Sequence, residues 1–353
     1  MNMNRRDVLQ ETVRHAAASD TPLAVHGSGS KAFYGRPVSG EPLPVCEHRG
    51  VIDYAPSELV VTARAGTPLA ELEARLAQAG QMLAFEPPHF GDRATLGGAI
   101  ACGLSGPRRP YAGAARDFVL GITCINGRGE YLRFGGQVMK NVAGYDLSRT
   151  LTGSHGTLAV LLDISLKVLP RPEAEITLSR SCSQPDAIRL FNQWAGQPLP
   201  LSGGCHLDGQ LYLRLAGTGE GVRAAAMRIG ADEIDESASL WRELREQRLG
   251  FFSGDTPLWR LSLPPATPPL EIGGPTLLDW GGAQRWLRSG LPAGSIRAAV
   301  AAYGGHATLF RGGERNADIF QPLPAPLLAV HRRLKRAFDP EGILNPGRMY
   351  ATL

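Results

Sequence analysis

Cysteine is scarce in this sequence, and its five cysteines are spread along the chain without a C-x-x-C pair. An odd number of cysteines argues against a disulfide framework, which is built from pairs. The spacing also excludes an iron–sulfur cluster, which needs four thiolates held close together. If electrons pass through this protein, a different group carries them. The cysteines are Cys46, Cys102, Cys124, Cys182 and Cys205.

Long apolar runs are missing as well. Nowhere do about eighteen apolar residues follow one another, so we expect no transmembrane helix. The opening segment, MNMNRRDVLQETVRHAAASD, is polar and amphipathic and has no apolar core of the kind found in signal peptides. These two absences predict a cytoplasmic location.

Concentrated positive charge is also lacking, although the formal net charge is +4. The basic residues are mostly arginines interspersed with acidic residues, and the single basic run, HRRLKR near the end, is typical of a solvated helix face. Nucleic-acid binding is therefore not indicated. Lysine is rare, so it is notable that Lys31 and Lys140 both stand in glycine-rich stretches.

Glycine, in contrast, is abundant, with 43 residues, and one glycine-rich loop follows an apolar segment in LAVHGSGSKAFYG. The loop satisfies the G-x-G-x-x-G/A fingerprint of a dinucleotide-binding Rossmann unit, which requires a helix directly after it. Here Gly35, Pro37, Gly40 and Pro42 interrupt any helix. The segment therefore predicts a strand and a loop whose N–H groups cradle an anion, or an ordinary turn between strands.

The remaining pattern predicts a mixed α and β chain. Helices are expected at 5–17, at 68–79 with Thr67 as N-cap and Pro68 in the first turn, and near 236–249. We interpret the residues between Pro87 and Ala114 as a long glycine-rich region that contains a loop cluster. Strands are expected at 23–26, 59–65, 118–125, 130–134 and 158–168.

A change of character after Pro170-Arg171-Pro172 predicts a domain boundary. We expect a first domain over 1–170, a smaller α+β domain over 171–330, and a final helix and tail over 331–353 that pack on the first domain.

Three loop clusters in the first domain are all rich in glycine, and together with the tail they carry a family resemblance. They are HGSGSK at 26–31, TLGG at 95–98 and GSHGTL at 153–158. Gly113 precedes RDFVLG at 116–121, and the tail reads FDP at 338–340 and LNPG at 344–347. In order and spacing this set resembles the FAD-binding domain of the vanillyl-alcohol oxidase and para-cresol methylhydroxylase (PCMH) type.

The resemblance implies a PCMH-type fold of two α/β subdomains with a truncated α+β cap, and it implies FAD as cofactor. It places Ser30 where many members have a histidine bonded covalently to the flavin, and His26 where an arginine is usual. Non-covalent FAD is therefore expected. The residues implied in FAD binding are Gly27, Ser28, Gly29, Ser30, Lys31, Thr95, Leu96, Gly97, Gly98, Gly103, Ser105, Gly106, Gly113, Arg116, Gly156, Val160, Asn345 and Arg348.

Within the family the segment KNVAGYDLSRTLTGSHGTLAV resembles the α-hydroxy-acid branch, and LWRLSLP, DWGGAQRWL and GGHATLFR resemble the FAD-binding subunits of glycolate oxidases. This implies oxidation of glycolate to glyoxylate with a longer related flavoprotein subunit and an iron–sulfur subunit as partners. These partners would hold the chain in the cytoplasm or at the inner face of the membrane. A non-catalytic assembly or electron-relay subunit, and a free-standing D-lactate-type dehydrogenase, remain the alternatives.

Oxidation of a hydroxy acid needs a cation for the carboxylate and a base for the hydroxyl proton. The candidate cations in the second domain are Arg260, Arg285 and Arg311, and the candidate base is His306. Cys205-His206 and the isolated His306 are too few ligands to predict a metal site. Trp280 and Trp286 are expected in the core rather than on the flavin, and His155 is expected to be a structural loop histidine.

Overall fold

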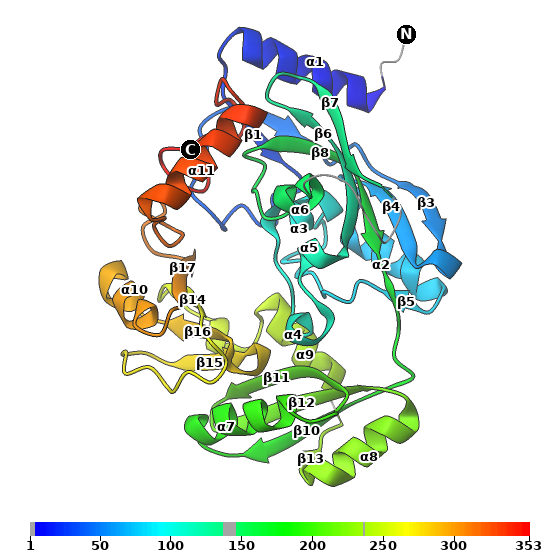
Figure 1. Cartoon of the computed structure of the whole chain (residues 1–353), viewed down its shortest axis with the longest axis vertical. Helices are drawn as coiled ribbons and strands as arrows, with labels where there is room; N and C mark the ends of the chain where they lie inside the picture. The colour runs from blue at the N-terminus through cyan, green and yellow to red at the C-terminus, as the bar shows by residue number, and fades with distance from the viewer. Residues whose placement is uncertain (1–3, 137–145, 236) are drawn as a thin grey trace.

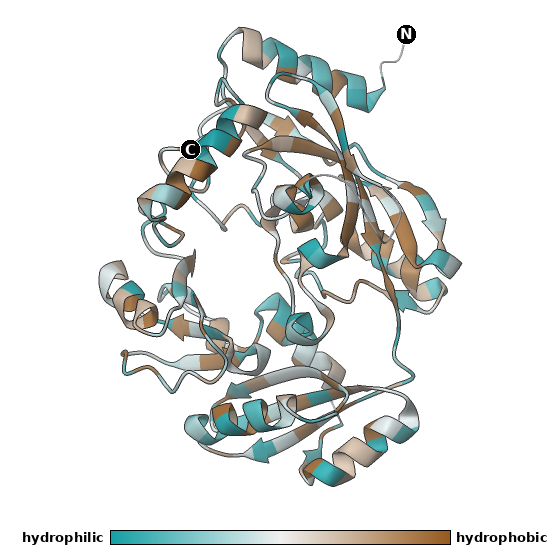
Figure 2. Ribbon diagram, viewed as in Figure 1, coloured by the Kyte–Doolittle hydropathy of each residue, from teal (hydrophilic) through white to brown (hydrophobic). Residues whose placement is uncertain are grey.

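The computed structural model describes residues 4–136, 146–235 and 237–353. Its N-terminal part (residues 4–170) is built on a five-stranded antiparallel sheet in the order β3-β4-β8-β6-β7. The bounds of these strands are β3 Val51–Ala55, β4 Val60–Arg64, β6 Val119–Asn126, β7 Tyr131–Gly135 and β8 Ala159–Lys167. Apolar residues are concentrated on this sheet (Figure 2), where alternate side chains enter one core.

Helices and two small sheets complete the N-terminal part. A parallel pair joins β1 (Leu23–His26) to β2 (Glu41–Pro44), and an antiparallel pair joins β5 (Gln81–Met82) to β9 (Leu169–Pro170). The helices are α1 Arg5–Ala18, α2 Leu69–Gln78, α3 Leu96–Cys102, α4 Arg109–Ala112, α5 Ala115–Phe118 and α6 Leu147–Leu151, with a short 3-10 turn η1 at Pro56–Glu58.

A second part, here called the cap (residues 171–324), is built on an antiparallel sheet in the order β13-β10-β12-β11-β15-β16-β14-β17. Its strands are β10 Ala174–Ser181, β11 Leu201–Leu207, β12 Gln210–Gly217, β13 Asp232–Glu233, β14 Leu258–Ser262, β15 Thr276–Asp279, β16 Gln284–Arg288 and β17 His306–Arg311. Its helices are α7 Gln184–Ala195, α8 Gly219–Ile229, α9 Ser237–Glu246 and α10 Ala293–Ala301, with 3-10 turns η2 at Gly250–Phe252 and η3 at Trp280–Gly282.

The last helix, α11 (Ala325–Phe338), leaves the cap and returns to the N-terminal part (Figure 1). It starts ahead of residue 331, where the sequence predicts the final segment to begin. Leu23 forms a parallel bridge with Leu344, and Phe338, Ile343 and Leu344 enter the core of the N-terminal part. The tail is therefore an integral piece of that part of the fold.

Two local predictions are wrong, and both concern a threonine before a helix. Thr67 does not cap α2, because its hydroxyl accepts the N–H of Gly50 at 2.9 Å and Pro68 takes the N-cap position. The glycine-rich region after Pro87 is not a loop at TLGGAIAC, because these residues form α3 and its N-cap. Thr95 caps that helix by accepting the N–H of Gly98 at 3.2 Å.

The other expected elements agree with the structure within about three residues at their ends. No helix follows the HGSGSK loop, and the chain turns instead into β2 at Glu41. This absence separates the fold from a Rossmann unit, whose first glycine loop opens a helix. Lys140 and the first residues of the segment KNVAGYDLSRT lie outside the described residues.

Candidate functional site

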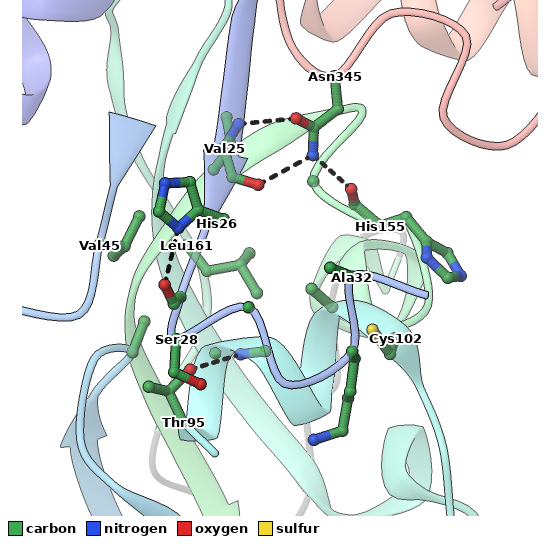
Figure 3. Close-up of a pocket in the computed structure, with 18 of the residues that line it drawn as sticks. Val25, His26, Ser28, Ala32, Val45, Thr95, Cys102, His155, Leu161 and Asn345 are labelled. Atoms are coloured by element: carbon green, nitrogen blue, oxygen red, sulfur yellow. Dashed lines mark hydrogen bonds between the residues drawn. The ribbon is translucent and has the colours of Figure 1, made fainter. Parts of the chain in front are cut away.

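The three glycine-rich loops meet around one cavity between β1, α3 and the start of β8 (Figure 3). Asn345 lies between Val25 and His155 at one end of it, and Ser28 and Thr95 lie at the other. The predicted cofactor residues that line this cavity are Gly27, Ser28, Gly29, Ser30, Lys31, Thr95, Gly97, Gly98, Gly156, Asn345 and Arg348.

Close backbone packing explains two of the glycines. A Cβ on Gly27 would lie 2.4 Å from the Thr95 Oγ1, and a Cβ on Gly97 would lie 2.7 Å from the Cβ of Ala65. The backbone of Gly27 therefore lies against the Thr95 side chain, and the start of α3 lies against Ala65, so a side chain at either glycine would disturb the cavity wall. Gly29 adopts a φ of 81°, a conformation that favours glycine.

The other predicted cofactor residues lie elsewhere. Leu96 and Val160 are fully buried and do not line the cavity, because their side chains point into the core. Gly106 packs against the Glu86 carbonyl, where a Cβ would be 2.5 Å away, and Gly113 ends α4 with a φ of 115°. These two glycines shape the chain. Gly103, Ser105 and Arg116 line a second cavity.

The two basic residues of the first cavity are already engaged with backbone. The Lys31 ammonium donates to the His89 carbonyl at 3.1 Å, and burial lowers the pKa of this lysine despite the nearby Cys102 and Glu246. The Arg348 guanidinium donates to the carbonyls of Arg36 at 2.6 Å and Tyr34 at 2.7 Å. Arg348 thus fixes the chain that follows the first loop.

Asn345 of the C-terminal tail forms hydrogen bonds with β1 and with the third glycine-rich loop. Its Oδ1 accepts the N–H of Val25 at 2.7 Å, and its Nδ2 donates to the carbonyls of His155 at 2.7 Å and Val25 at 3.2 Å. The tail, β1 and the third glycine loop therefore meet at one side chain.

His155, which the sequence predicts to be a structural residue, lies among aromatic side chains. Its ring packs against Tyr34 and Phe320, with centroids 5.0 and 5.3 Å apart. Burial, with the charges of Arg348 and Arg260, lowers its pKa to about 3. The imidazole is consequently neutral at physiological pH.

The second cavity, here called the cleft, lies between the N-terminal part and the cap. Cys102 and His155 line both cavities, so the two spaces adjoin. The cap contributes two neighbouring rows of its sheet. Ser262 of β14 pairs with Gln284 and His306, and Arg260 pairs with Trp286 and Thr308. All of these except Trp286 line the cleft, because residues two apart in a strand share a face.

The four predicted catalytic residues divide into two pairs. Arg260 and His306 line the cleft, where desolvation and then the Arg260 charge lower the pKa of His306. Arg285 and Arg311 are not brought to it. Arg285 points to the other side of β16 and donates to the carbonyls of Gly282, Pro268 and Thr267.

Arg311 lies at the end of β17 and stacks over Phe33, 4.6 Å from the ring centroid. It therefore serves packing between the cap and the first loop. Trp286 is buried in the core as expected, whereas Trp280 lines the cleft and is only partly buried.

Sequence reasoning missed Arg109, Ser262 and Gln284, which also line the cleft. The two-residue spacing of Arg260 and Ser262 in LWRLS was an available signal for a shared face. Gln284 required the strand register, because it is placed by its pairing with Ser262.

The described residues contain neither a candidate metal cluster nor a candidate membrane-spanning helix. No group of three or more His, Cys, Asp or Glu in the described part of the chain is arranged to hold a metal ion. None of the described helices is both long and apolar enough to cross a membrane.

Comparison with known proteins gives two family matches. Residues 3–135 match the FAD binding domain family, and residues 320–349 match the C-terminal domain of FAD linked oxidases. The chain is 52% identical over 345 residues to glycolate oxidase subunit GlcE of Escherichia coli (strain K12), covering 98% of this chain and 97% of that protein.

Other relatives match a shorter stretch. Glycolate oxidase subunit GlcD of Bacillus subtilis (strain 168) is 30% identical over 161 residues, which covers 44% of this chain and 34% of that protein. D-lactate dehydrogenase of Anaerostipes hadrus is 33% identical over 129 residues, covering 36% and 26%.

Among solved structures, an alkyldihydroxyacetonephosphate synthase superposes with a TM-score of 0.66 at 14% identity, covering 96% of this chain and 75% of that one. This likeness concerns the fold alone. The near-full-length identity, the two family matches and the three-loop cavity agree. The chain therefore belongs to the PCMH-type family of FAD-binding flavoproteins, in the branch of the glycolate oxidase subunit GlcE.

Proposed function

We propose that this chain is the FAD-binding subunit of a glycolate oxidase complex and contributes to the two-electron oxidation of glycolate to glyoxylate. The observation that carries the proposal is the junction of the two cavities at Cys102 and His155, which brings a glycine-loop cavity against a cleft lined by Arg260 and His306. The 52% identity to a glycolate oxidase subunit supports the choice of substrate.

The residues of the first cavity fit FAD. The backbone of the first loop and of α3 faces the cavity at Gly27 and Gly97, where a Cβ would collide with a neighbour. Backbone N–H groups of Ser28, Gly29 and Ser30 would hold the pyrophosphate. Thr95 and Gly98 would line its flank, and Gly103 and Ser105 would extend the binding surface toward the cleft.

The flavin is held without a covalent bond in this proposal, because Ser30 stands where many family members carry the bonding histidine. Trichloroacetic acid precipitation tests this directly. We expect all of the flavin colour in the supernatant. Colour that stays in the washed pellet would overturn the non-covalent assignment.

In the cleft, Arg260 would bind the substrate carboxylate through its planar guanidinium. It makes no hydrogen bond or ion pair with any described residue, and its contact in the structure is a cation–π approach of 5.9 Å to Tyr34. Both edges of the Arg260 guanidinium are thus available to the substrate carboxylate.

His306 would accept the hydroxyl proton of the substrate while a hydride leaves the α-carbon and the carbonyl of glyoxylate forms. The lowered pKa of His306 keeps its imidazole neutral and able to accept a proton at neutral pH. When bound, FAD supplies the acceptor for the two electrons. His155 and Tyr34 pack beside the junction and limit water there.

Electron transfer onward would depend on partner subunits. We propose a larger flavoprotein subunit related to GlcD and an iron–sulfur subunit as partners, since this sequence has no cluster-binding cysteine pattern. Through them the chain would reside in the cytoplasm or at the inner face of the membrane.

Anaerobic addition of glycolate to the FAD-loaded chain, alone and with its partner subunits, tests the proposal. Bleaching of the flavin at about 450 nm in this chain supports it. Arg260→Met and His306→Gln are expected to slow bleaching at least a hundredfold, whereas Arg311→Met and His331→Gln, outside the cleft, are expected to change it less than threefold.

Two outcomes would contradict the proposal. A flavin in this chain that glycolate never bleaches, even within the complete complex, would favour a non-catalytic assembly role. Bleaching by D-lactate alone, without partners and with no response to glycolate, would favour a free-standing dehydrogenase.

A further inference from the structure

The cleft carries more positive charge than a monocarboxylate needs. Its lining includes Arg109, Arg116 and Arg260, and none of the described residues that line it is Asp or Glu. None of the three guanidiniums has a hydrogen bond or an ion pair with another residue of the described chain, although 15 ion pairs occur elsewhere. Unpaired cations gathered in one cleft attract an anion.

Arg109 lies close enough to both other arginines to feel their charges. Desolvation lowers its pKa, and the charges of Arg260 and Arg116 lower it further, with only Asp117 opposing them. The carboxylate of Asp117 is itself occupied by the N–H of Ala114 at 2.8 Å. The repulsion among the arginines is therefore left for a ligand to relieve.

Packing holds Arg109 in place. Its guanidinium lies over the Trp280 ring, 4.4 Å from the centroid, and the Trp280 indole donates to the Gly106 carbonyl at 3.0 Å. The cation is thus fixed between the N-terminal part and the cap, with no need for a carboxylate partner.

This charge lies outside the glycine-loop cavity. Arg109, Arg116 and Arg260 line the cleft and not the glycine-loop cavity, and Cys102 and His155 are the residues common to both linings. A ligand in the cleft with one carboxylate on Arg260 leaves Arg109 and Arg116 unmatched.

We propose that Arg109 and Arg116 form a second anion subsite, so that the cleft binds 2-hydroxy acids with two carboxylates more tightly than glycolate. This inference rests on the proposed function for the role of Arg260 as the site of the first carboxylate. It assigns Arg116, which the sequence links to the cofactor, to the substrate instead.

Anaerobic rapid mixing with the FAD-loaded chain at low ionic strength tests the subsite. Glycolate, tartronate and D-malate are mixed separately, and the flavin absorbance change that precedes reduction reports each dissociation constant. We expect the two dicarboxylates to bind at least tenfold more tightly than glycolate, and the advantage to shrink as NaCl rises from about 20 to 200 mM.

Variants locate the effect. Arg109→Gln and Arg116→Gln are each expected to reduce the ratio of glycolate to tartronate dissociation constants at least fivefold. Arg109→Lys is expected to reduce this ratio less than Arg109→Gln does. Arg260→Gln is expected to weaken both ligands. Arg128→Gln, on the exposed turn between β6 and β7, is the matched control and leaves the ratio unchanged.

Equal affinities for glycolate and tartronate, or a preference that survives both Arg109→Gln and Arg116→Gln, would overturn the subsite. The flavin spectrum shows that each variant still holds FAD. Tighter dicarboxylate binding without any reduction by glycolate in the complex would refute the proposed function and leave the subsite standing. Reduction by glycolate without a dicarboxylate preference would refute the subsite and leave the proposed function standing.

Discussion

At the scale of single residues, glycine at position 27 is required by a neighbour far away in the sequence. The Thr95 side chain fills the space that a Cβ on Gly27 would need, and the same hydroxyl caps α3. One substitution thus disturbs two of the three loops around the cavity.

We expect Gly27→Ala to raise the FAD dissociation constant at least tenfold, because Thr95 must rotate and release the Gly98 N–H. Fluorescence titration of the apoprotein with FAD measures the change. Gly294→Ala is the control, since an added Cβ there meets nothing within 4 Å. Wild-type affinity in Gly27→Ala would refute this account of the cradle.

Asn345 combines three hydrogen bonds with a φ of 42°, which costs an ordinary side chain about 1–2 kcal/mol. Asn345→Gly removes the bonds and keeps the conformation easy, whereas Asn345→Ala adds the strain. Urea unfolding is expected to show a loss of about 2–4 kcal/mol for Asn345→Gly and a larger loss for Asn345→Ala. An alanine variant more stable than the glycine variant would contradict this.

At the scale of elements, the turn η3 between β15 and β16 of the cap places Trp280 in the lining of the cleft. Trp280 has a φ of 53°, an unusual value for an aromatic residue, and the buried Asp279 carboxylate holds the turn by accepting the Trp280 N–H at 2.7 Å and the Gln284 amide at 3.0 Å. Desolvation raises the pKa of Asp279 to about 7.

This raised pKa makes stability depend on pH. In the unfolded chain Asp279 ionises near 3.8, whereas in the fold it stays protonated up to about 7. The stability that the protonated Asp279 contributes is therefore fully present below pH 3.8. It is lost as the pH rises toward 7, at up to roughly 1.4 kcal/mol per pH unit. Urea unfolding of wild type and Asp279→Asn between pH 5 and 8 checks this.

We expect the wild type to lose stability relative to Asp279→Asn across that range. Asp232→Asn, on an exposed edge strand, is the control and should follow the wild-type profile. Parallel profiles for wild type and Asp279→Asn would mean that the carboxyl ionises normally in the fold.

At the scale of the whole molecule, an ion network centred on the buried Arg108 and Arg214 joins the N-terminal part to the cap. Glu86 lies 3.2 Å from Arg108 and 2.9 Å from Arg214 of β12, and Glu175 of β10 contacts the same arginines. Burial alone would raise the pKa of Glu86, but Arg214 and Arg108 hold it below its usual value.

We expect Glu86→Ala to destabilise the protein by about 3–5 kcal/mol, because two arginines lose a buried partner. Limited proteolysis at the connection between β9 and β10 should accelerate together with the fall in melting temperature. Asp186→Asn, which breaks an exposed pair with Arg189, should leave the melting temperature almost unchanged. An equal effect of the two substitutions would argue against the network as the joint.

Much of this arrangement could be predicted from local pattern. Alternating apolar residues predicted β8, amphipathic spacing predicted α1, and proline and glycine after HGSGSK ruled out a Rossmann helix. Such patterns work because they depend on backbone geometry within a few residues. α3 escaped prediction, since Gly97 and Gly98 are poor helix formers whose place in the helix depends on packing against Ala65.

The sequence by itself thus determined the order of the elements and the three loops that FAD requires. Only the tertiary structure decided which side chains face the cleft. Arg260, Ser262, Gln284 and His306 come from three strands and share one face through antiparallel register, while Arg285, one residue from Gln284, faces away. Register is set by long-range pairing, so no short stretch of sequence contains it.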